Sequence, residues 1–220
     1  MKNHPIPRAA LALGTAALLA LAVPGCTSLP SPQELDAQAA AMMKASFRED
    51  GIAKLDRLQQ DLGQKACSSD QPPPDAVARQ IEREALASVK WPAGGRYLGD
   101  WKTGEKLAQN GRGMTWTDKS AAPSANGAQC CNCHQISKEE ISFGTIGPSL
   151  YQYGKLRGVK DPYAASSAEV VQYTWAKLWN SKAVSACSNM PRFGHMGLLD
   201  ENQIRDVMAL LLDPRSPVNQ

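Results

Sequence analysis

One short segment constrains this chain more than any other feature: Cys130-Cys131-Asn132-Cys133-His134, which contains the spacing Cys-x-x-Cys-His. Two thiols on one turn can reach the two vinyl groups of a single porphyrin, and the adjacent histidine then presents its imidazole to the iron from the same side. The pattern predicts one covalently attached haem c, bound through Cys130 and Cys133, with His134 as an iron ligand. Such a cofactor would also organise long loops, which are otherwise uncommon inside a compact helical domain.

Two other uses of a Cys-x-x-Cys pair compete with haem attachment. A thioredoxin-like redox pair requires the strand and helix of a βαβ unit around it, and a structural zinc site requires a second pair of Cys or His ligands. The sequence around Cys130 and Cys133 contains neither signal. We therefore expect haem.

A second motif follows the attachment segment. Gly147-Pro148-Ser149-Leu150 places Pro148 fourteen residues after His134. A Gly-Pro-x-Leu segment is typical of class I cytochromes c, where it passes beside the proximal histidine and a backbone carbonyl accepts the Nδ1 proton. An acceptor of this kind fixes the ring and raises its basicity as a ligand. We assign Pro148 to the haem site; taken alone, Gly-Pro is also an ordinary turn.

The iron then needs a sixth ligand or an open position. Met190 lies in a predicted loop 56 residues beyond His134 and ahead of the last helix, where class I cytochromes c keep their distal methionine. We assign Met190 as this iron ligand and keep His195 as its rival. Histidine with methionine raises the reduction potential relative to two imidazoles and closes the iron to other ligands, as in an electron carrier. The candidates set aside are Met114, which precedes the attachment motif, Met208, on a helix face, and Met196.

Three cysteines remain once the haem takes two and Cys26 is set aside. The preferred pairing joins Cys67, at the end of the amino-terminal helices, to Cys187, three residues before Met190, and leaves Cys131 free beside the haem. In the alternative, all three are small buried apolar side chains. Connectivity does not follow from a sequence alone.

The amino terminus is predicted to be a secretory signal over residues 1–25. Residues 1–8 are polar and basic, and residues 9–23 form an apolar stretch shorter than the roughly 20 residues that span a bilayer. Val23-Pro24-Gly25-Cys26 resembles a bacterial lipobox, so either Cys26 carries lipid or an ordinary signal is cleaved nearby. Both alternatives place the mature chain in the periplasm, where disulfides persist. A membrane would be reached only through such a lipid anchor.

Apolar residues recur at helical spacing along the chain, and no alternating strand pattern of useful length occurs. We expect an all-α protein, with a helical amino-terminal extension over residues 26–96 and a class I cytochrome c-like domain over residues 97–220. Helices are predicted over residues 31–51, 52–62, 76–90, 99–110, 166–181 and 200–213. Long irregular connections are predicted over residues 111–165 and 181–199.

Local signals predict particular helix ends and contacts. Capping boxes predict helices that begin at Ser31, Ser166 and Asp200. Gly104 costs a helix about 1 kcal/mol relative to alanine, and the close approach of another helix is a common compensation. The first two amphipathic helices are expected to pack on a neighbouring surface.

Composition argues against two classes of function. The formal net charge is only +3, whereas a protein that binds nucleic acid is expected to carry a clustered basic surface. A mean hydropathy of -0.36 does not suit a polytopic membrane protein.

Together, these segments resemble SoxX, the family of monohaem subunits of the SoxAX cytochromes of sulfur oxidation. The resemblance covers nearly the whole mature chain. Its matching segments are residues 45–47, 51–58, 60–61, 66–68, 147–150, 187–194 and 213–219. Cys131 departs from the family, which usually carries a non-thiol residue there, and this puts the pairing of the cysteines in doubt.

The resemblance implies a function and partners. The chain would be the electron-transfer subunit of an L-cysteine S-thiosulfotransferase, in a heterodimer with a dihaem or monohaem SoxA-like subunit that transforms the substrate. It would accept electrons from the oxidative coupling of thiosulfate to a cysteine of a SoxYZ-like carrier protein and pass them to a soluble cytochrome c. No catalytic residue is assigned to this chain. Arg157 and Arg192 are candidates to meet haem propionates, a partner surface or solvent.

Two alternatives stay open. The first is a free-standing periplasmic electron-carrier cytochrome c, which would purify without a SoxA-like partner. The second is a structural lipoprotein without haem, which would carry no covalent porphyrin in a denatured sample.

Overall fold

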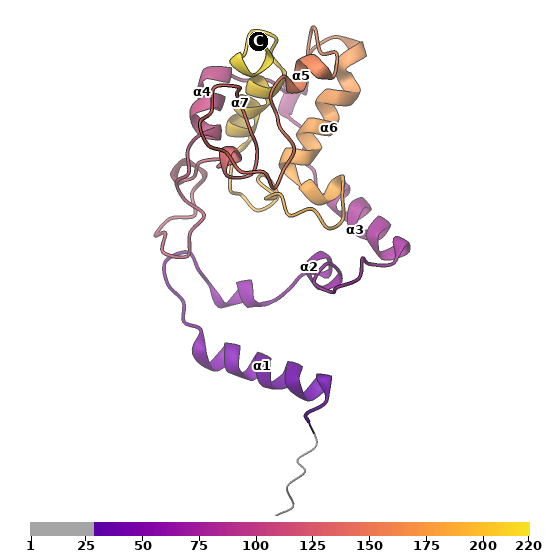
Figure 1. The fold of residues 1–220 in the computed structure, drawn as a ribbon, viewed down its shortest axis with the longest axis vertical. Helices are drawn as coiled ribbons and strands as arrows, with labels where there is room; N and C mark the ends of the chain where they lie inside the picture. Colours follow the sequence, from indigo (N-terminus) through magenta and orange to yellow (C-terminus); the bar gives the residue numbers. More distant parts are fainter. Residues whose placement is uncertain (1–28) are drawn as a thin grey trace, which may run out of the picture. The chain divides into compact units, whose positions relative to one another are not determined.

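A computed structural model describes residues 29–220 of the chain (Figure 1). The predicted signal over residues 1–25 and the predicted lipidation site at Cys26 lie outside the described residues. The described part contains α-helices and short 3-10 turns and no strand, so the prediction of an all-α protein is confirmed. The α-helices are α1 (Pro32–Ser46), α2 (Leu62–Ala66), α3 (Asp75–Ala87), α4 (Trp101–Ala108), α5 (Tyr153–Leu156), α6 (Ala168–Trp179) and α7 (Glu201–Leu212). The 3-10 turns are η1 (Leu55–Leu58), η2 (Ala93–Gly95), η3 (Pro123–Ala125), η4 (Cys130–Asn132), η5 (Ala165–Ser167), η6 (Ser181–Ala183) and η7 (Pro217–Asn219).

The chain separates into two compact units, one ending at Ser46 and the other running from Phe47 to Gln220. The boundary predicted between residues 96 and 97 lies inside the second unit. In the first unit, the predicted capping box is present: the backbone N–H of Ser31 donates to the carboxylate of Glu34 at 2.7 Å, and the N–H of Glu34 donates to the Ser31 hydroxyl at 3.3 Å. Taken by itself, α1 has no buried residue, and its packing on a neighbouring surface stays a prediction. Between Leu35 and Met42 its apolar positions are alanines, which have little surface to bury.

The continuous helix predicted over residues 52–62 is wrong. The backbone N–H of Ile52 donates to the carbonyl of Asp118 at 2.8 Å, which draws this stretch of chain into a long-range contact. The turn η1 follows, and α2 begins after its N-cap Asp61, whose carboxylate accepts from the backbone N–H of Gln64 at 2.7 Å. A 3-10 turn and the start of a separate helix therefore stand in place of the predicted one.

Two further capping boxes were predicted, at the N-termini of α6 and α7. At α7 the predicted box is present, because Gln203 N–H donates to the Asp200 carboxylate at 2.9 Å and Asp200 N–H donates to the Gln203 side chain at 2.9 Å. At α6 it is absent: the N-cap residue is Ser167, whose hydroxyl donates to the carbonyl of Asp161 at 2.7 Å. The short helix α5 lies in the segment predicted to be irregular.

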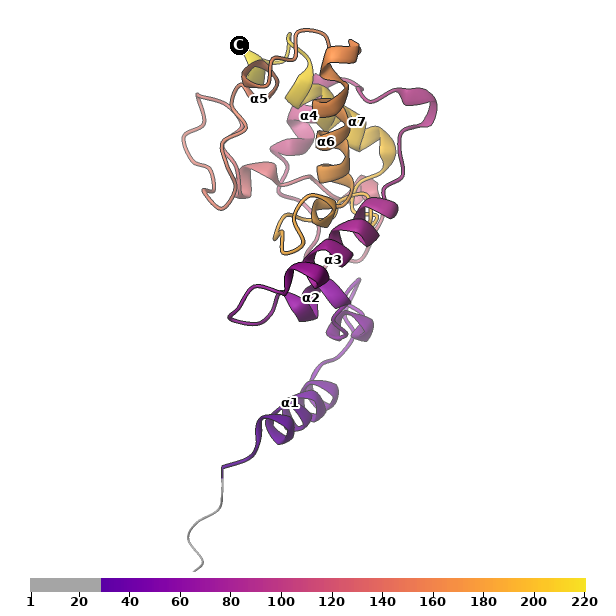
Figure 2. The same ribbon diagram turned by 90° about the vertical axis from the view of Figure 1, so that its right-hand side faces the viewer.

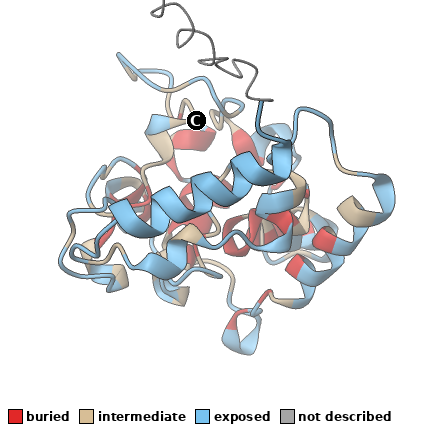
Figure 3. Cartoon of the chain, turned by 90° about the horizontal axis from the view of Figure 1, so that it is seen from below, coloured by how far each residue is buried: buried red, intermediate tan, exposed pale blue. Residues whose placement is uncertain are grey.

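The helices α4, α6 and α7 lie side by side and build the core of the second unit (Figures 1 and 2). At the crossing of α4 and α7, a Cβ atom built on Gly104 would lie 2.0 Å from the backbone oxygen of Asp206, so the predicted close approach of another helix is confirmed. Trp175 of α6 is fully buried, and its indole N–H donates to the carbonyl of Lys90 at 2.9 Å. Buried residues, red in Figure 3, gather in this core.

The crossing at Gly104 generates a stability prediction. Gly104→Ala should lower the free energy of unfolding by roughly 1–3 kcal/mol, the usual cost of overpacking, because α7 must move away from the new methyl group. Denaturant unfolding followed by circular dichroism measures the change. The matched control is Gly111→Ala, since a Cβ at Gly111 meets no atom within 4 Å. Equal stability of the Gly104 variant and the parent protein would contradict the close crossing.

Candidate functional site

The attachment motif forms a tight turn. In and after η4, the backbone N–H groups of Cys133 and His134 both donate to the carbonyl of Cys130, at 3.0 and 2.9 Å. Cys130 packs against the hydrophobic core, and this burial raises the pKa of its thiol to about 12, with the neighbouring Cys131 adding to the shift. Cys130, Cys131 and Cys133 are free cysteines, so both predicted attachment thiols are available for thioether bonds.

The ring of His134 lies against the Gly-Pro segment. Its Nδ1 is 2.6 Å from the carbonyl oxygen of Pro148, and because a carbonyl only accepts, Nδ1–H is the donor in this contact. A Cβ atom built on Gly147 would lie 2.1 Å from Cε1 of this ring, so only glycine allows the contact. The backbone thus holds the imidazole in the tautomer that binds a metal through Nε2.

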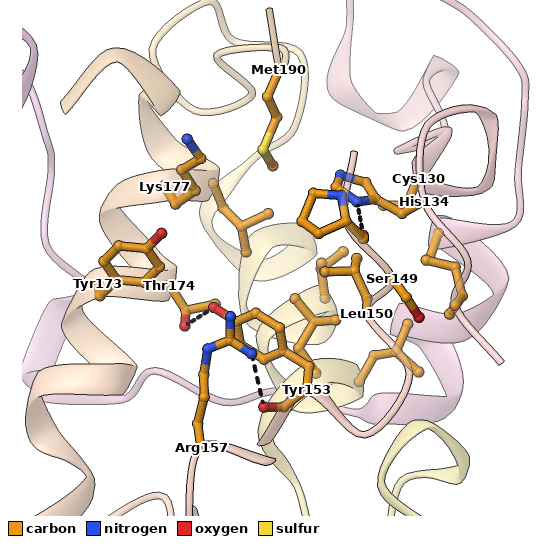
Figure 4. A pocket seen from close by; sticks show the side chains of 17 residues that line it. Cys130, His134, Ser149, Leu150, Tyr153, Arg157, Tyr173, Thr174, Lys177 and Met190 are labelled. Carbon is orange, nitrogen blue, oxygen red and sulfur yellow. Dashed lines mark hydrogen bonds between the residues drawn. The ribbon is translucent and has the colours of Figure 1, made fainter. Parts of the chain in front are cut away.

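Two adjoining cavities open beside this ring, with volumes of about 330 and 130 Å³. Cys130, His134, Pro148, Lys177 and Met190 line both cavities, and in Figure 4 the imidazole of His134 and the thioether of Met190 point into the smaller one. The remaining wall of that smaller cavity is largely apolar. Its apolar residues are Ala108, Ile136, Leu150, Leu178, Val207, Leu210 and Leu211.

Met190 is positioned by the loop that carries it. Its carbonyl accepts from the hydroxyl of Ser181 at 2.6 Å, and its backbone N–H donates to the hydroxyl of Ser188 at 3.3 Å. Three residues earlier, Cys187 forms a disulfide with Cys67, with an S–S distance of 2.01 Å and a Cα–Cα distance of 5.4 Å. The structure therefore fastens the loop of Met190 to the segment that follows α2.

The other methionines and the rival histidine lie in different places. Met114 lines the larger cavity together with Met190, although its place before the attachment motif argued against it in the sequence. Met208 is fully buried in α7, and Met196 is 56% exposed. His195 lines a separate cavity with Asp61 and Lys182. Met114 and Met190 are therefore the thioethers of this candidate site.

Cationic and hydroxyl groups that the sequence did not single out as a set lie on the side of the smaller cavity away from His134 (Figure 4). The guanidinium of Arg157 lies 3.7 Å from the centre of the Tyr153 ring and donates to the Tyr153 carbonyl at 3.2 Å. Lys177 lies 3.5 Å from the Ser188 hydroxyl, and burial lowers the pKa of its ammonium group. The i,i+4 spacing of Tyr173 and Lys177 was the available signal, because it places both on one face of α6.

Arg192 does not line either of these cavities. Its guanidinium forms an ion pair with Asp61 at 2.9 Å, beside the cavity of His195. In residues 29–220, no group of three or more His, Cys, Asp and Glu side chains is placed to hold a bare metal ion. No helix in the same part of the chain combines the length and apolar character needed to cross a membrane.

Comparison with known proteins gives one relative to report. A protein of Aquifex aeolicus (strain VF5), named "Uncharacterized lipoprotein", is 36% identical over 165 residues, which cover 73% of this chain and 73% of that protein. No family model matches the chain.

The disulfide beside Met190 generates a second prediction. Cys187→Ser should lower the free energy of unfolding by roughly 2–5 kcal/mol, because the bridge closes a loop across a sequence separation of 120 residues. The measurement is denaturant unfolding of the non-reduced protein. Cys131→Ser, which removes a free thiol, should change stability much less. Alkylation of Cys67 and Cys187 in the folded, non-reduced parent protein would show that the bridge does not form.

Proposed function

The chain belongs to the same protein family as the Aquifex aeolicus lipoprotein, and from that premise we propose that it is an exported, lipid-anchored, monohaem c-type cytochrome. The name of the relative supports an anchor, and Cys26 is the residue that would carry the lipid. The proposed fold of residues 97–220 is that of a class I cytochrome c, and the helical composition of this part supports it.

One observation carries the proposal. The turn with two free thiols presents His134 with its Nδ1 held by Pro148, and the thioether of Met190 points into the same largely apolar cavity. This set fits haem c in chemistry, because it offers thiols for the vinyl groups, an imidazole, a thioether and an apolar wall. Bound there, haem c would supply a one-electron iron couple whose reduction potential a thioether ligand raises.

The residues of the chain have separate tasks in this proposal. Cys130 and Cys133 would attach the porphyrin, His134 and Met190 would bind the iron, and the Pro148 carbonyl orients the imidazole. The largely apolar wall keeps water from the iron, which favours electron transfer over ligand binding.

The far side of the cavity suits the acidic end of a haem. Arg157 and Lys177 place two cationic groups there, and Tyr173 adds a hydroxyl. Carboxylates accept strong, charge-assisted hydrogen bonds from such groups. We assign Arg157 and Lys177 to the two propionates. Arg192, which pairs with Asp61, has no part in this site.

The physiological role is proposed from the resemblance to SoxX. The chain would be the electron-transfer subunit of an L-cysteine S-thiosulfotransferase, paired with a SoxA-like subunit whose reaction releases two electrons as thiosulfate joins a carrier-protein cysteine. This chain would receive those electrons singly and pass them to a soluble cytochrome c. The Cys67–Cys187 bridge, which joins two of the resembling segments, supports the proposal.

The ligand assignment is testable by one substitution. Met190→Ala, made with a working cytochrome c maturation system, should retain covalent haem but lose the sulfur-to-iron charge-transfer band at the red end of the ferric spectrum. Met114→Ala is the matched control, because Met114 lines the same larger cavity and should leave the band unchanged. Loss of the band in the Met114 variant alone would transfer the role to Met114. A colourless parent protein would refute the haem and favour the structural lipoprotein.

The partner is testable separately. Affinity purification of the chain from its native source should bring down a SoxA-like haem protein in equal amount, detected by haem staining and mass spectrometry. A haem-bearing chain that elutes alone from the same extract would favour the free-standing electron carrier. That outcome would leave the proposed ligands of the iron untouched.

A further inference from the structure

A third cavity, of about 160 Å³, lies apart from the two that His134 lines. Its wall combines the start of α2 with residues of α3, η6 and the loop that follows Met190. The polar side chains that line it are Asp61, Glu84, Ser88, Asn180, Lys182, Arg192 and His195. The proposed cytochrome function uses none of them.

Lys182 is the most buried cation on this wall, with 9% of its surface exposed. Within the described chain, its ammonium group donates to the carbonyl of Ala186 at 2.9 Å, and it carries more N–H groups than that acceptor satisfies. A Cβ atom built on Gly63 would lie 3.1 Å from the Lys182 nitrogen, so the glycine keeps space beside this charge. Burying an ammonium group costs free energy unless hydrogen-bond acceptors take up its remaining N–H groups.

Arg192 and His195 add further donors. The guanidinium of Arg192 contacts Asp61 at 2.9 Å with one of its terminal nitrogens, and its side chain is 17% exposed. The ring of His195, at the rim, makes no hydrogen bond to any residue in the range 29–220. The remaining N–H groups of both side chains are therefore available to a ligand.

The acceptors on the wall also have partners. The Asp61 carboxylate accepts from the Gln64 backbone at 2.7 Å as well as pairing with Arg192. The Ser88 hydroxyl donates to the Ala85 carbonyl at 2.6 Å and accepts from Asn180 at 2.9 Å. The Asn180 side-chain oxygen accepts from the Lys182 backbone at 3.2 Å.

Glu84 is the remaining carboxylate. It is exposed and accepts from Gln80 at 2.8 Å. Lys182, Arg192 and His195 are thus the side chains of this wall with N–H groups left for an anion.

We propose that this cavity binds a small tetrahedral oxyanion, such as sulfate or phosphate. Lys182 would hold the anion from the buried end, Arg192 from the side and His195 from the rim. Charge-assisted hydrogen bonds from ammonium and guanidinium groups are the strongest that a protein offers an oxyanion. The volume leaves room for a few accompanying waters at about 30 Å³ each.

Burial and neighbouring charges act together on the titratable groups of this wall. Burial lowers the pKa of Lys182, Asp61 opposes that shift, and Arg192 adds to it. Burial also lowers the pKa of His195; Arg192 adds to this shift and Asp61 opposes it. Burial acts to raise the pKa of Asp61, but the Gln64 backbone and Arg192 outweigh it, so the carboxyl is charged.

The test is isothermal titration calorimetry of the purified full chain with sodium sulfate, and separately phosphate, in chloride buffer of constant ionic strength. We expect saturable binding with one anion per chain. Lys182→Gln should weaken the affinity about tenfold or more, the effect of losing a charge-assisted hydrogen bond. His195→Gln, at the exposed rim, is a second variant whose folding does not depend on a buried side chain, and it should weaken binding severalfold.

Lys65→Gln is the matched control, because Lys65 is exposed on α2 and does not line the cavity. It removes the same charge from the same region and should change the affinity less than twofold. Absence of saturable binding in the parent protein, or equal weakening in the Lys65 and Lys182 variants, would overturn the site. Because Met190 and His134 line other cavities, this result does not depend on the outcome for haem.

Discussion

The hydrogen bond between His134 and the Pro148 carbonyl is the contact on which the candidate site depends. It sets the tautomer of the ring and so decides which nitrogen can bind a metal. The contact is held by the backbone on both sides, since the N–H of Gly147 donates to the carbonyl of Cys133 at 2.8 Å and that of Leu150 donates to Gln135 at 2.8 Å. A rotation of the ring would break its hydrogen bond to Pro148, while the two backbone hydrogen bonds keep the segment from Gly147 to Leu150 in place. The segment from Gly147 to Leu150 also places Leu150 in the cavity wall. One segment therefore both orients the His134 ring and contributes to the apolar lining.

The methionine side of the cavity is fixed by different means. No helix carries Met190, and the loop is held instead by the hydroxyls of Ser181 and Ser188 and by the bridge from Cys187 to Cys67. A covalent tie from the segment after α2 to this loop stabilises the folded state mainly by restricting the unfolded chain. This explains why an amino-terminal segment with few buried residues still bears on the site. Its contribution is the anchor at Cys67 rather than core packing.

The sequence predicted the parts of the structure that local chemistry determines. The capping boxes at Ser31 and Asp200 involve residues three apart in the sequence. The close crossing of α4 and α7 was predictable because a glycine inside a helix, here Gly104, lets another backbone approach. The predictions that failed are those that tertiary contacts override. The backbone N–H of Ile52 donates to the carbonyl of Asp118 instead of continuing a helix, and the hydroxyl of Ser167 donates to the carbonyl of Asp161 instead of capping α6. In the site, the spacing of the motifs located Cys130, His134 and Met190. It could not locate Arg157 and Lys177 on one wall, because they come from separate elements that only packing brings together.

The loop after Met190 shows why its thioether has one position. Successive residues enter different surroundings: Met190 faces the candidate haem cavity, Arg192 pairs with Asp61 beside the polar cavity, and Phe193 is 3% exposed in the core. Gly194 restricts the loop further, because a Cβ atom at this position would lie 2.4 Å from the ring of Trp179, so only glycine fits there. A shift of the chain by two residues would place the Arg192 charge in the apolar cavity, where an unpaired ion is strongly disfavoured. The charge of Arg192, the burial of Phe193 and the close backbone approach at Gly194 therefore fix the register of the loop together. This register places the side chain of Met190 in the candidate haem cavity.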